Sequence, residues 1–305
     1  MSVAVVGLGE VLWDLLPGGR QLGGAPANFA YHAAALGARA AVVSRVGRDA
    51  VGRDLLDRLQ AFGLDVAGVE IDPAAPTSTV SVALGADGQP RYVIHENVAW
   101  DRLAGSAAAH TAVARADVLC FGTLAQRAPA ARAALLGLVA AARPDALRVF
   151  DVNLRQHYHS PEVIAASLAR ADVLKINDAE LPVLAAQFGL GGDERAQLAA
   201  LAARFPLRAV AFTRGARGSV LFAGGTWSEL RGETVAVADT VGAGDSFTAA
   251  LALGLVAGWT LDLVHRRAVA LAAYVCTQPG GTPPLPVELT APFRGLAPAS
   301  GGPRA

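Results

Sequence analysis

Between residues 239 and 247 the chain reads Asp239-Thr-Val-Gly-Ala-Gly-Asp-Ser-Phe247, and a pattern rich in Ala and Leu continues to about residue 257. That pattern predicts a helix from about residue 246. Gly242 and Gly244 leave the preceding turn without side chains, so consecutive backbone N–H groups can converge on an anion. The helix start adds its own unpaired N–H groups and the positive end of its dipole. The stretch therefore predicts an anion-binding turn.

Asp245 lies at the mouth of this turn. A carboxylate is an unusual neighbour for a phosphate unless it takes part in the chemistry. A general base beside a phosphoryl group in transfer would explain both features. The alternative is a glycine turn in which Asp245 only caps the helix. By itself the stretch leaves these two interpretations open.

The composition limits the class of protein. The chain has 305 residues, of which 53% are hydrophobic and 17% are charged, and its formal net charge is +0. This is enough for one large α/β domain with a small accessory element, and it is too apolar for a disordered chain. The lack of net basicity and of Lys or Arg runs argues against a nucleic-acid partner.

The sequence also predicts a cytoplasmic location. The N-terminus lacks the basic start and long apolar core of a signal peptide, and no uninterrupted apolar stretch reaches membrane-spanning length. We therefore expect no membrane contact. Cys120 and Cys276 lie in apolar surroundings, which predicts buried, reduced thiols without disulfide or metal roles.

Continuous apolar strands alternate with helical patterns along most of the chain, most regularly from residue 106 onward. This alternation predicts a mostly parallel sheet with helices on both faces. The expected strands are residues 3–6, 40–46, 117–121, 147–152, 172–176 and 209–213. The expected helices are residues 27–36, 52–62, 106–114, 129–142, 161–169, 180–188 and 194–205. Two further runs, 219–222 and 227–238, predict an antiparallel edge.

Short strand patterns without intervening helices stand out, at residues 11–16, 66–71, 79–84 and 91–95, and Asp87-Gly88 predicts a hairpin between the last two. We expect these runs to form a small projecting sheet from about residues 11–24 and 66–101, as a candidate lid. His95, Asn97 and Trp100 at its exit suit a sugar ligand. The alternative is that they only cover the sheet.

A second glycine-rich loop lies near the N-terminus. Gly23 and Gly24 permit close approach of a small ligand, and Asn28, one turn into the expected helix, offers a donor and an acceptor. The alternative is an ordinary loop and capped helix. Gly7-x-Gly9 lacks the third glycine and the helix of a dinucleotide-binding turn, and the chain has no P-loop pattern. Both of those nucleotide folds are therefore excluded.

Polar residues gather where four expected strands end: Asp151-Val-Asn153-Leu-Arg155, Lys175-Ile-Asn177-Asp-Ala-Glu180, Thr213-Arg-Gly215 and residues 239–245. Because open α/β sheets bind ligands at the carboxyl ends of their strands, these clusters predict one site. Thr213, Gly215 and Gly218 would let a nucleotide lie across a strand end. Asn177 and Glu180 can organise Mg²⁺ through water, or they form a helix cap.

The chain resembles the PfkB/ribokinase family of sugar kinases in three motifs: Gly23-Gly-Ala-Pro-Ala-Asn28, Asn177-x-x-Glu180 and Asp239-Thr-Val-Gly-Ala-Gly-Asp245. The resemblance extends to about Pro286. It implies a ribokinase-like three-layer αβα sandwich, Rossmann-like with a mostly parallel sheet, as a single domain over residues 1–290 with a β-sheet lid. It also implies ATP as cosubstrate, Mg²⁺ and, in many members, activation by K⁺. We expect residues 291–305 to form a flexible tail.

The resemblance implies a role for individual residues. Asp245 matches the catalytic base, and Gly242, Ala243 and Gly244 match the anion hole. The sugar ligands are Asp14, Gly23, Gly24 and Asn28, with His95, Asn97 and Arg155 as further candidates. The ATP ligands are Lys175, Asn177, Thr213, Gly215, Gly218, Gly242 and Gly244. Asn177 and Glu180 match the magnesium motif, acting through water, and Asp239 and Gly281 match the monovalent-cation site.

The first motif, with Gly9-Glu-Val-Leu-Trp-Asp-Leu-Leu-Pro17 before it, resembles bacterial fructokinases, which convert fructose and ATP to fructose 6-phosphate and ADP. A 2-keto-3-deoxygluconate kinase, a ribokinase and a nucleoside kinase are alternatives within the family. A non-catalytic sugar- or nucleotide-binding regulator on the same fold is an alternative of another class. An exposed lid sheet would also permit a homodimer that forms through the lid.

Overall fold

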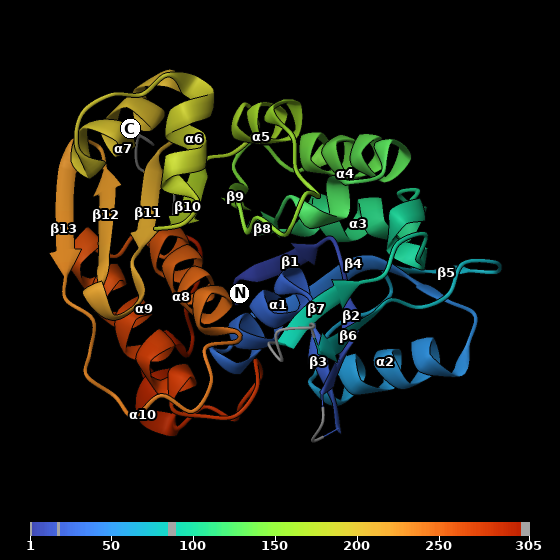
Figure 1. Cartoon of the computed structure of the whole chain (residues 1–305). Helices are drawn as coiled ribbons and strands as arrows, with labels where there is room; N and C mark the ends of the chain where they lie inside the picture. Colours follow the sequence, from blue (N-terminus) through green and yellow to red (C-terminus); the bar gives the residue numbers. More distant parts are fainter. Residues whose placement is uncertain (1, 17–18, 85–89, 300–305) are drawn as a thin grey trace.

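A computed structural model describes residues 2–16, 19–84 and 90–299 (Figure 1). Within them, nine strands form the main sheet in the order β13-β12-β11-β10-β9-β8-β1-β4-β5. Neighbours from β5 to β11 pair in parallel, whereas β12 and β13 form an antiparallel edge. The strands are β1 (Ala4–Leu8), β4 (Arg39–Gly47), β5 (Val69–Asp72), β8 (Val118–Phe121), β9 (Leu147–Asp151), β10 (Val173–Asn177), β11 (Ala209–Thr213), β12 (Ser219–Ala223) and β13 (Thr226–Leu230).

Helices cover both faces of this sheet, because alternate strand residues point to opposite sides and both sets are apolar. In β8, Leu119 and Phe121 join one hydrophobic cluster and Val118 and Cys120 join the other. The first cluster packs against α3 (Ala107–Arg115), α4 (Pro129–Ala141), α5 (Pro161–Leu168), α6 (Leu181–Phe188) and α7 (Glu194–Arg204). The second packs against α1 (Ala25–Ala35), α2 (Ala50–Ala61), α8 (Ala243–Val256) and α9 (Leu261–Cys276). The expected three-layer α/β sandwich is confirmed.

A second, four-stranded sheet has the order β3-β2-β6-β7 and lies to one side of the main sheet (Figure 1). Its strands are β2 (Leu12–Leu16), β3 (Gly19–Gly23), β6 (Thr79–Leu84) and β7 (Pro90–Ile94). β6 and β7 pair antiparallel as the hairpin signal predicts, although most of the turn, with Asp87-Gly88, lies outside the described residues. The sheet matches the expected lid in three of its strands.

The expectation for residues 66–71 is wrong. This run forms β5, which pairs in parallel with β4 at the edge of the main sheet, with Val69 buried against it. The fourth lid strand is β3 instead, which pairs antiparallel with β2. Arg20 and Gln21 interrupt its apolar pattern, so a glycine-rich loop was the natural interpretation.

Two further expectations need correction. The edge strand β13 ends at Leu230, and residues 231–238 are irregular, with Val237 63% exposed. Residues 291–299 are not a free tail: Phe293 is buried against Trp259, and the Ala299 N–H donates to the Val256 carbonyl. The rest of the expected tail lies outside the described residues. No helix in the described part of the chain is long and apolar enough to cross a membrane.

The tetrapeptide Ala-Asp-Val-Leu occurs twice, at residues 116–119 and 171–174, and it serves the same function both times. Asp117 accepts a hydrogen bond from the Ala4 N–H at the start of β1, at 2.8 Å. Asp172 likewise accepts one from the Arg148 N–H at the start of β9, at 2.8 Å. Each aspartate thus satisfies the first unpaired donor of the neighbouring strand.

We expect Asp117→Ala to lower the free energy of unfolding by about 1 to 2 kcal/mol, because it leaves the nearly buried Ala4 N–H without an acceptor. Urea titration followed by circular dichroism measures this change. Asp57→Ala is the control, since Asp57 is exposed on α2, and it should change stability by less than about 0.5 kcal/mol. Equal stability of the two variants would contradict this role of Asp117.

Candidate active site

The candidate site lies where β1, β9, β10 and β11 end, beside the first turns of α1 and α8. Because these strands are parallel neighbours, or are joined through β8, their carboxyl ends share one edge of the sheet. Asp151 ends β9, Lys175 lies in β10, and Asp245 occupies the first turn of α8. The polar strand ends of the sequence therefore do converge.

The turn before α8 can be built only with glycine at its N-cap. Gly242 has φ of 76°, a left-handed conformation, and a Cβ there would lie 2.3 Å from the Gly281 carbonyl oxygen. No side chain caps α8. The Ala243 N–H makes a long bond of 3.4 Å to the Thr240 carbonyl oxygen. The N–H groups of Gly244 and Asp245 have no acceptor among the described residues, so they remain available to the predicted anion hole of Gly242, Ala243 and Gly244.

Lys175, the only lysine of the chain, lies directly behind this turn. Its Nζ donates to Asp151 Oδ1 at 3.1 Å, and both side chains are more than 90% buried. The Thr248 hydroxyl donates to the other oxygen, Asp151 Oδ2, at 3.0 Å. A Cβ on Gly244 would lie 3.0 Å from Lys175 Nζ. A buried positive charge therefore supports the predicted anion hole.

Asn28 joins α1 to α8 at the Asp245 carboxylate. Its Nδ2 donates to Asp245 Oδ2 at 2.9 Å. Its Oδ1 is buried and has no partner among the described residues, which leaves an acceptor for a ligand hydroxyl. Burial, followed by the nearby Asp151 carboxylate, raises the pKa of Asp245 to about 6, against the opposing effects of Asn28, Lys175 and Arg155. Asp245 nevertheless keeps part of its surface exposed, so the mouth of the site is open.

Further acidic groups approach from the lid and from β1. Burial raises the pKa of Asp14, in β2, to about 6, although Arg155 opposes the shift. A Cβ on Gly23 would lie 2.3 Å from Asp14 Oδ2, and one on Gly24 would lie 2.5 Å from the Glu10 carbonyl oxygen. The two glycines therefore allow β3 and the start of α1 to pack tightly against these residues.

Glu10 is a site residue that the sequence analysis missed. It follows β1, is 3% exposed, and its Oε2 has no partner among the described residues. Burial raises its pKa to about 7, and both Arg155 and Asp245 lie within electrostatic reach. The position of Glu10 directly after the first buried strand could have identified it as a site residue from the sequence. Thr248, one turn into α8, carries no such sequence signal, because its partner Asp151 comes from a strand far away in sequence.

Asp239 and Gly281, the predicted monovalent-cation ligands, belong to two loops that are bonded to each other. Asp239 Oδ2 accepts from the Gly280 N–H at 3.1 Å, and Oδ1 accepts from the Val241 N–H at 3.0 Å. His32 of α1 bonds the Gly281 carbonyl oxygen at 2.9 Å. Burial lowers the pKa of His32 to about 4, so its neutral Nε2–H is the donor. The loops are well fixed, and the cation stays a prediction.

Asn177 and Glu180 form the helix cap that was the alternative to a magnesium site. Asn177 Oδ1 accepts from the Glu180 N–H at 3.0 Å, and Glu180 Oε2 accepts from the Asn177 N–H at 2.8 Å. Glu180 Oε1 accepts from the Leu154 N–H at 2.9 Å. In the described part of the chain, no group of three or more His, Cys, Asp or Glu residues could hold a metal ion. A role for this pair toward Mg²⁺ through water stays a prediction, and the second lone pairs of these oxygens would serve it.

The predicted nucleotide residues lie at the end of β11 and in the turn that follows it. The Thr213 hydroxyl donates to the Ile176 carbonyl oxygen at 3.4 Å. Gly215 is exposed, and a Cβ on it would meet no other described atom within 4 Å. A Cβ on Gly218 would lie 2.0 Å from the Leu230 carbonyl oxygen, so this glycine is required by the approach of β13. A contact of these residues with a nucleotide stays a prediction.

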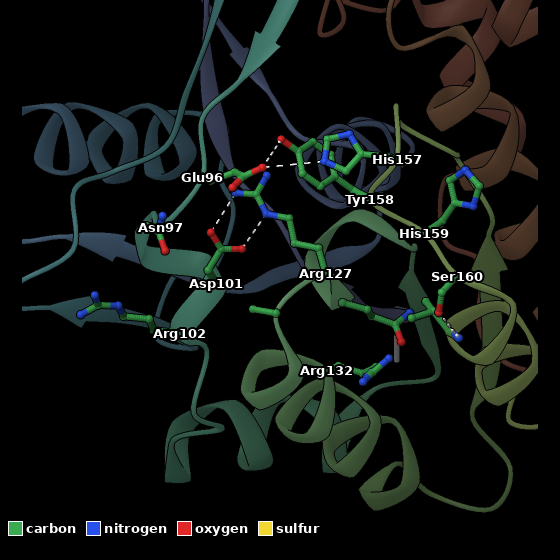
Figure 2. A pocket seen from close by; sticks show the side chains of 13 residues that line it. Glu96, Asn97, Asp101, Arg102, Arg127, Arg132, His157, Tyr158, His159 and Ser160 are labelled. Atoms are coloured by element: carbon green, nitrogen blue, oxygen red, sulfur yellow. Dashed lines mark hydrogen bonds and ion pairs between the residues drawn. The ribbon is translucent and has the colours of Figure 1, made fainter.

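The residues at the lid exit lie apart from the Asp245 group. His95 is exposed and lies 3.3 Å from the Ser81 hydroxyl. Asn97 lines a separate cavity with Arg127, His157 and Tyr158 (Figure 2). Trp100 is buried, and the guanidinium carbon of Arg127 lies 4.0 Å from the centroid of the Trp100 ring. Trp100 is therefore a packing residue. Arg155, by contrast, lies within electrostatic reach of Glu10, Asp14 and Asp245.

Comparison with known proteins gives a consistent result. Residues 18–288 match the sequence profile described as pfkB family carbohydrate kinase. Fructokinase-2 of Solanum habrochaites is 30% identical over 93% of this chain and 94% of its own length. Fructokinase-1 of Oryza sativa subsp. japonica is 30% identical over 94% of this chain and 96% of its own length.

Solved structures share the fold. A sugar kinase from Pyrococcus horikoshii in complex with ATP has a TM-score of 0.78 at 27% identity, over 91% of this chain and 94% of its own. The ATP-bound fructokinase of Xylella fastidiosa has a TM-score of 0.80 over 96% of this chain and 98% of its own. Its 22% identity supports the fold alone.

The raised pKa of Asp245 has a consequence for stability. The folded protein favours the protonated form, so the ionised carboxylate destabilises the fold above pH 6, and this cost disappears as the pH falls toward 4. We expect Asp245→Asn to raise the free energy of unfolding at pH 8 by about 1 to 2 kcal/mol, less than the full shift implies because Asp245 is partly exposed. The gain should vanish near pH 4.

Urea titrations at pH 8 and pH 4 measure this difference, with Asp57→Asn as the matched exposed control. A variant that is less stable than the wild type at pH 8 would show that Asp245 is a structural carboxylate.

Proposed function

The chain belongs to the pfkB family of carbohydrate kinases and is a sugar kinase, and we propose that it transfers the γ-phosphoryl group of ATP to a primary hydroxyl of fructose. The observation that carries the proposal is the position of Asp245. Its carboxylate is held by Asn28 at the uncapped start of α8, directly in front of a buried lysine. A proton acceptor and an anion cradle therefore share one opening.

Asp245 would take the proton of the attacking hydroxyl. As the hydroxyl oxygen bonds to the γ-phosphorus, the bond from that phosphorus to the bridging oxygen of ADP breaks, and the hydroxyl proton passes to Asp245. A pKa of about 6 makes Asp245 a stronger base than an ordinary aspartate while leaving it largely ionised at neutral pH. Burial and the Asp151 carboxylate thus tune it for this role.

The start of α8 would stabilise the transferring phosphoryl group. Its unpaired N–H groups, the positive end of the helix dipole and the Lys175 ammonium behind Gly244 all favour negative charge at this point. ATP as the donor is supported by the ATP complex of the related sugar kinase from Pyrococcus horikoshii. Thr213 and Gly215 would border the nucleotide at the end of β11, where the strand end is accessible.

Metal ions complete the proposal. Mg²⁺ would neutralise the phosphate oxygens of ATP, and Asn177 and Glu180 would position it through water. Both residues are held rigidly by their mutual cap, which suits an indirect role. K⁺ would bind where the loop of Asp239 and the loop of Gly281 are hydrogen-bonded to each other. These loops lie against the turn before α8, because Gly242 of that turn packs closely on Gly281.

Fructose is favoured over the alternatives by the fructokinase relatives at 30% identity. The group of acceptors formed by Asp14, Asn28 Oδ1 and Asp245 also suits a ligand with several hydroxyl donors. A specific observation keeps 2-keto-3-deoxygluconate as the second candidate: Arg155 is an exposed cation facing these acids, and it could pair with a sugar carboxylate.

The lid sheet has an exposed apolar row that bears on assembly. Leu15 of β2 and Val93 of β7 are 41% and 40% exposed, and both flank Ser81 of β6 in register. Residues in such a row share one face of the sheet. We keep a homodimer formed through this face as a prediction.

We expect Asp245→Asn to lower kcat by about 10²- to 10⁴-fold with little change in ATP affinity, because the variant keeps the hydrogen bond to Asn28 but loses the base. A coupled assay of ADP release measures kcat, and nucleotide titration measures ATP binding. Asp57→Asn should behave as the wild type. Near-normal turnover by Asp245→Asn would refute the assignment of the base.

The acceptor is tested by the same ADP-release assay with fructose, ribose, 2-keto-3-deoxygluconate and nucleosides at equal concentrations. We expect the highest kcat/KM for fructose. A preference for 2-keto-3-deoxygluconate that is abolished by Arg155→Gln would establish the second candidate. Absence of turnover on every acceptor would instead favour a regulator that binds without catalysis.

A further inference from the structure

A second cavity lies between the lid exit and the starts of α4 and α5 (Figure 2). Its volume is about 460 Å³, which falls in the range of small-molecule sites. Its lining includes Arg127, Arg132, His157, His159 and Ser160. None of the residues Asp14, Asn28 or Asp245 lines it, so it is separate from the site proposed for sugar phosphorylation.

Arg127 has a donor that the protein leaves unused. Its Nε and Nη2 bond the two oxygens of Asp101, at 2.7 Å and 2.8 Å, and Nη2 also donates to the His95 carbonyl oxygen at 2.6 Å. The guanidinium lies over the rings of Trp100 and Tyr158, and its side chain is only 7% exposed. Its remaining nitrogen, Nη1, is buried and has no partner among the described residues.

A buried arginine nitrogen without an acceptor is costly, and a ligand oxygen would satisfy it. Nη1 occupies the end of the guanidinium away from Asp101, because Nε and Nη2 are the nitrogens that bond its carboxylate. The fork of Arg127 is held rigidly by Asp101 and by two aromatic rings. Its free donor is therefore fixed in position before any ligand binds.

The start of α4 adds to this positive character. Ala128, its N-cap residue, offers no capping side chain, and Pro129 follows. The N–H groups of the next residues therefore lack a side-chain acceptor, and Ala128 and Arg132 both line the cavity. The Arg132 side chain has no hydrogen bond within the described part of the chain, although the exposed Glu162 lies within electrostatic reach of it. The start of α5, capped by Ser160, borders the same space.

The carboxylates of the lining are already engaged. Asp101 bonds Arg127 through both oxygens. Glu96 Oε1 accepts from the Tyr158 hydroxyl at 2.8 Å and lies 3.9 Å from His157 Nε2. Neither neutralises Arg132 or the α4 start through a direct bond. The cavity therefore favours an anion over a neutral or cationic ligand.

Backbone strain also concentrates here. Among the described residues, Asn97, Asn153 and Gln156 are the non-glycine residues with positive φ, at 57°, 44° and 47°. Asn97 belongs to the lid exit, and the other two belong to the loop after β9 that carries His157 and Tyr158 to the cavity. Strained residues of this kind gather where a structure holds a ligand or moves.

We propose that this cavity is a binding site for a small molecule bearing a phosphate monoester, held by Arg127 Nη1, Arg132 and the uncapped start of α4. A phosphate oxyanion offers the acceptors that Arg132 and the start of α4 lack, and Arg127 Nη1 would meet a further oxygen of the same molecule. The site does not depend on which sugar the enzyme phosphorylates, and it lies outside the phosphoryl-transfer centre.

The test is isothermal titration calorimetry at 150 mM NaCl with inorganic phosphate and with glycerol 3-phosphate. A saturating non-hydrolysable ATP analogue with Mg²⁺ is present throughout, so that its γ-phosphate occupies the proposed anion hole of Gly242 to Asp245. We expect one equivalent of ligand to bind the wild type. Malonate is the comparison ligand that separates a phosphate site from a carboxylate site, and it should bind at least ten-fold more weakly.

Two variants and two matched controls make the test specific. Ala128→Asp supplies α4 with its own carboxylate cap, so it should abolish phosphate binding while leaving the melting temperature equal or higher. Arg132→Gln should weaken binding at least about ten-fold. Thr260→Asp adds the same cap to α9, whose start also lacks one, and Arg115→Gln removes an exposed charge on α3. Both controls should bind as the wild type.

The proposal is overturned if the wild type binds neither probe, or if malonate binds it as tightly as phosphate does. It is also overturned if Ala128→Asp binds phosphate as the wild type does, or if Arg115→Gln weakens binding as much as Arg132→Gln. Because sugar turnover is not the readout, such a result leaves the proposed fructokinase activity unaffected.

Discussion

The buried ion pair between Lys175 and Asp151 is the interaction on which the site depends. Asp151, Asp245 and Glu180 approach one another at the sheet edge, and burial raises the pKa of the last two. Lys175 opposes both shifts and holds Asp151 at 3.1 Å. A lone lysine thus allows a cluster of acids to coexist with an anion-binding helix start. Removing one partner of such a pair would leave an uncompensated buried charge.

The hydrogen bonds of the site join side chains from distant parts of the chain. Asn28 reaches Asp245 across 217 positions, and Thr248 reaches Asp151 across 97. Each bond joins a helix to a neighbouring element at the open end of the sheet, so the packing of α1 against α8 sets the geometry of the base. Gly242 and Gly281 have no side chains, so the loop before α8 and the loop after α9 can meet at van der Waals distance.

Sequence patterns predicted the repeating part of the fold because its signals are local. The strands after residue 106 are apolar on both faces, and helix caps such as Ser160 and Asp193 mark helix starts directly. The errors came where pairing is not local. Residues 69–72 resemble a lid strand, yet they pair with β4, and Gly19–Gly23 resembles a loop, yet it pairs with β2. Alternation cannot say which partner a short strand will find.

By itself the sequence determined the family and the α/β class, and it predicted a chemistry for Asp245 with its glycine turn, because these depend on residue types at fixed spacing. Only the tertiary structure decided that Glu10 and Arg155 come within electrostatic reach of Asp245, whereas Asn97 lines a separate cavity. It also decided that Asn177 and Glu180 cap a helix, and that Arg127 keeps a donor free. The physical reason is that burial, pKa and unsatisfied hydrogen bonds belong to the surroundings of a residue, and those surroundings are assembled from distant segments.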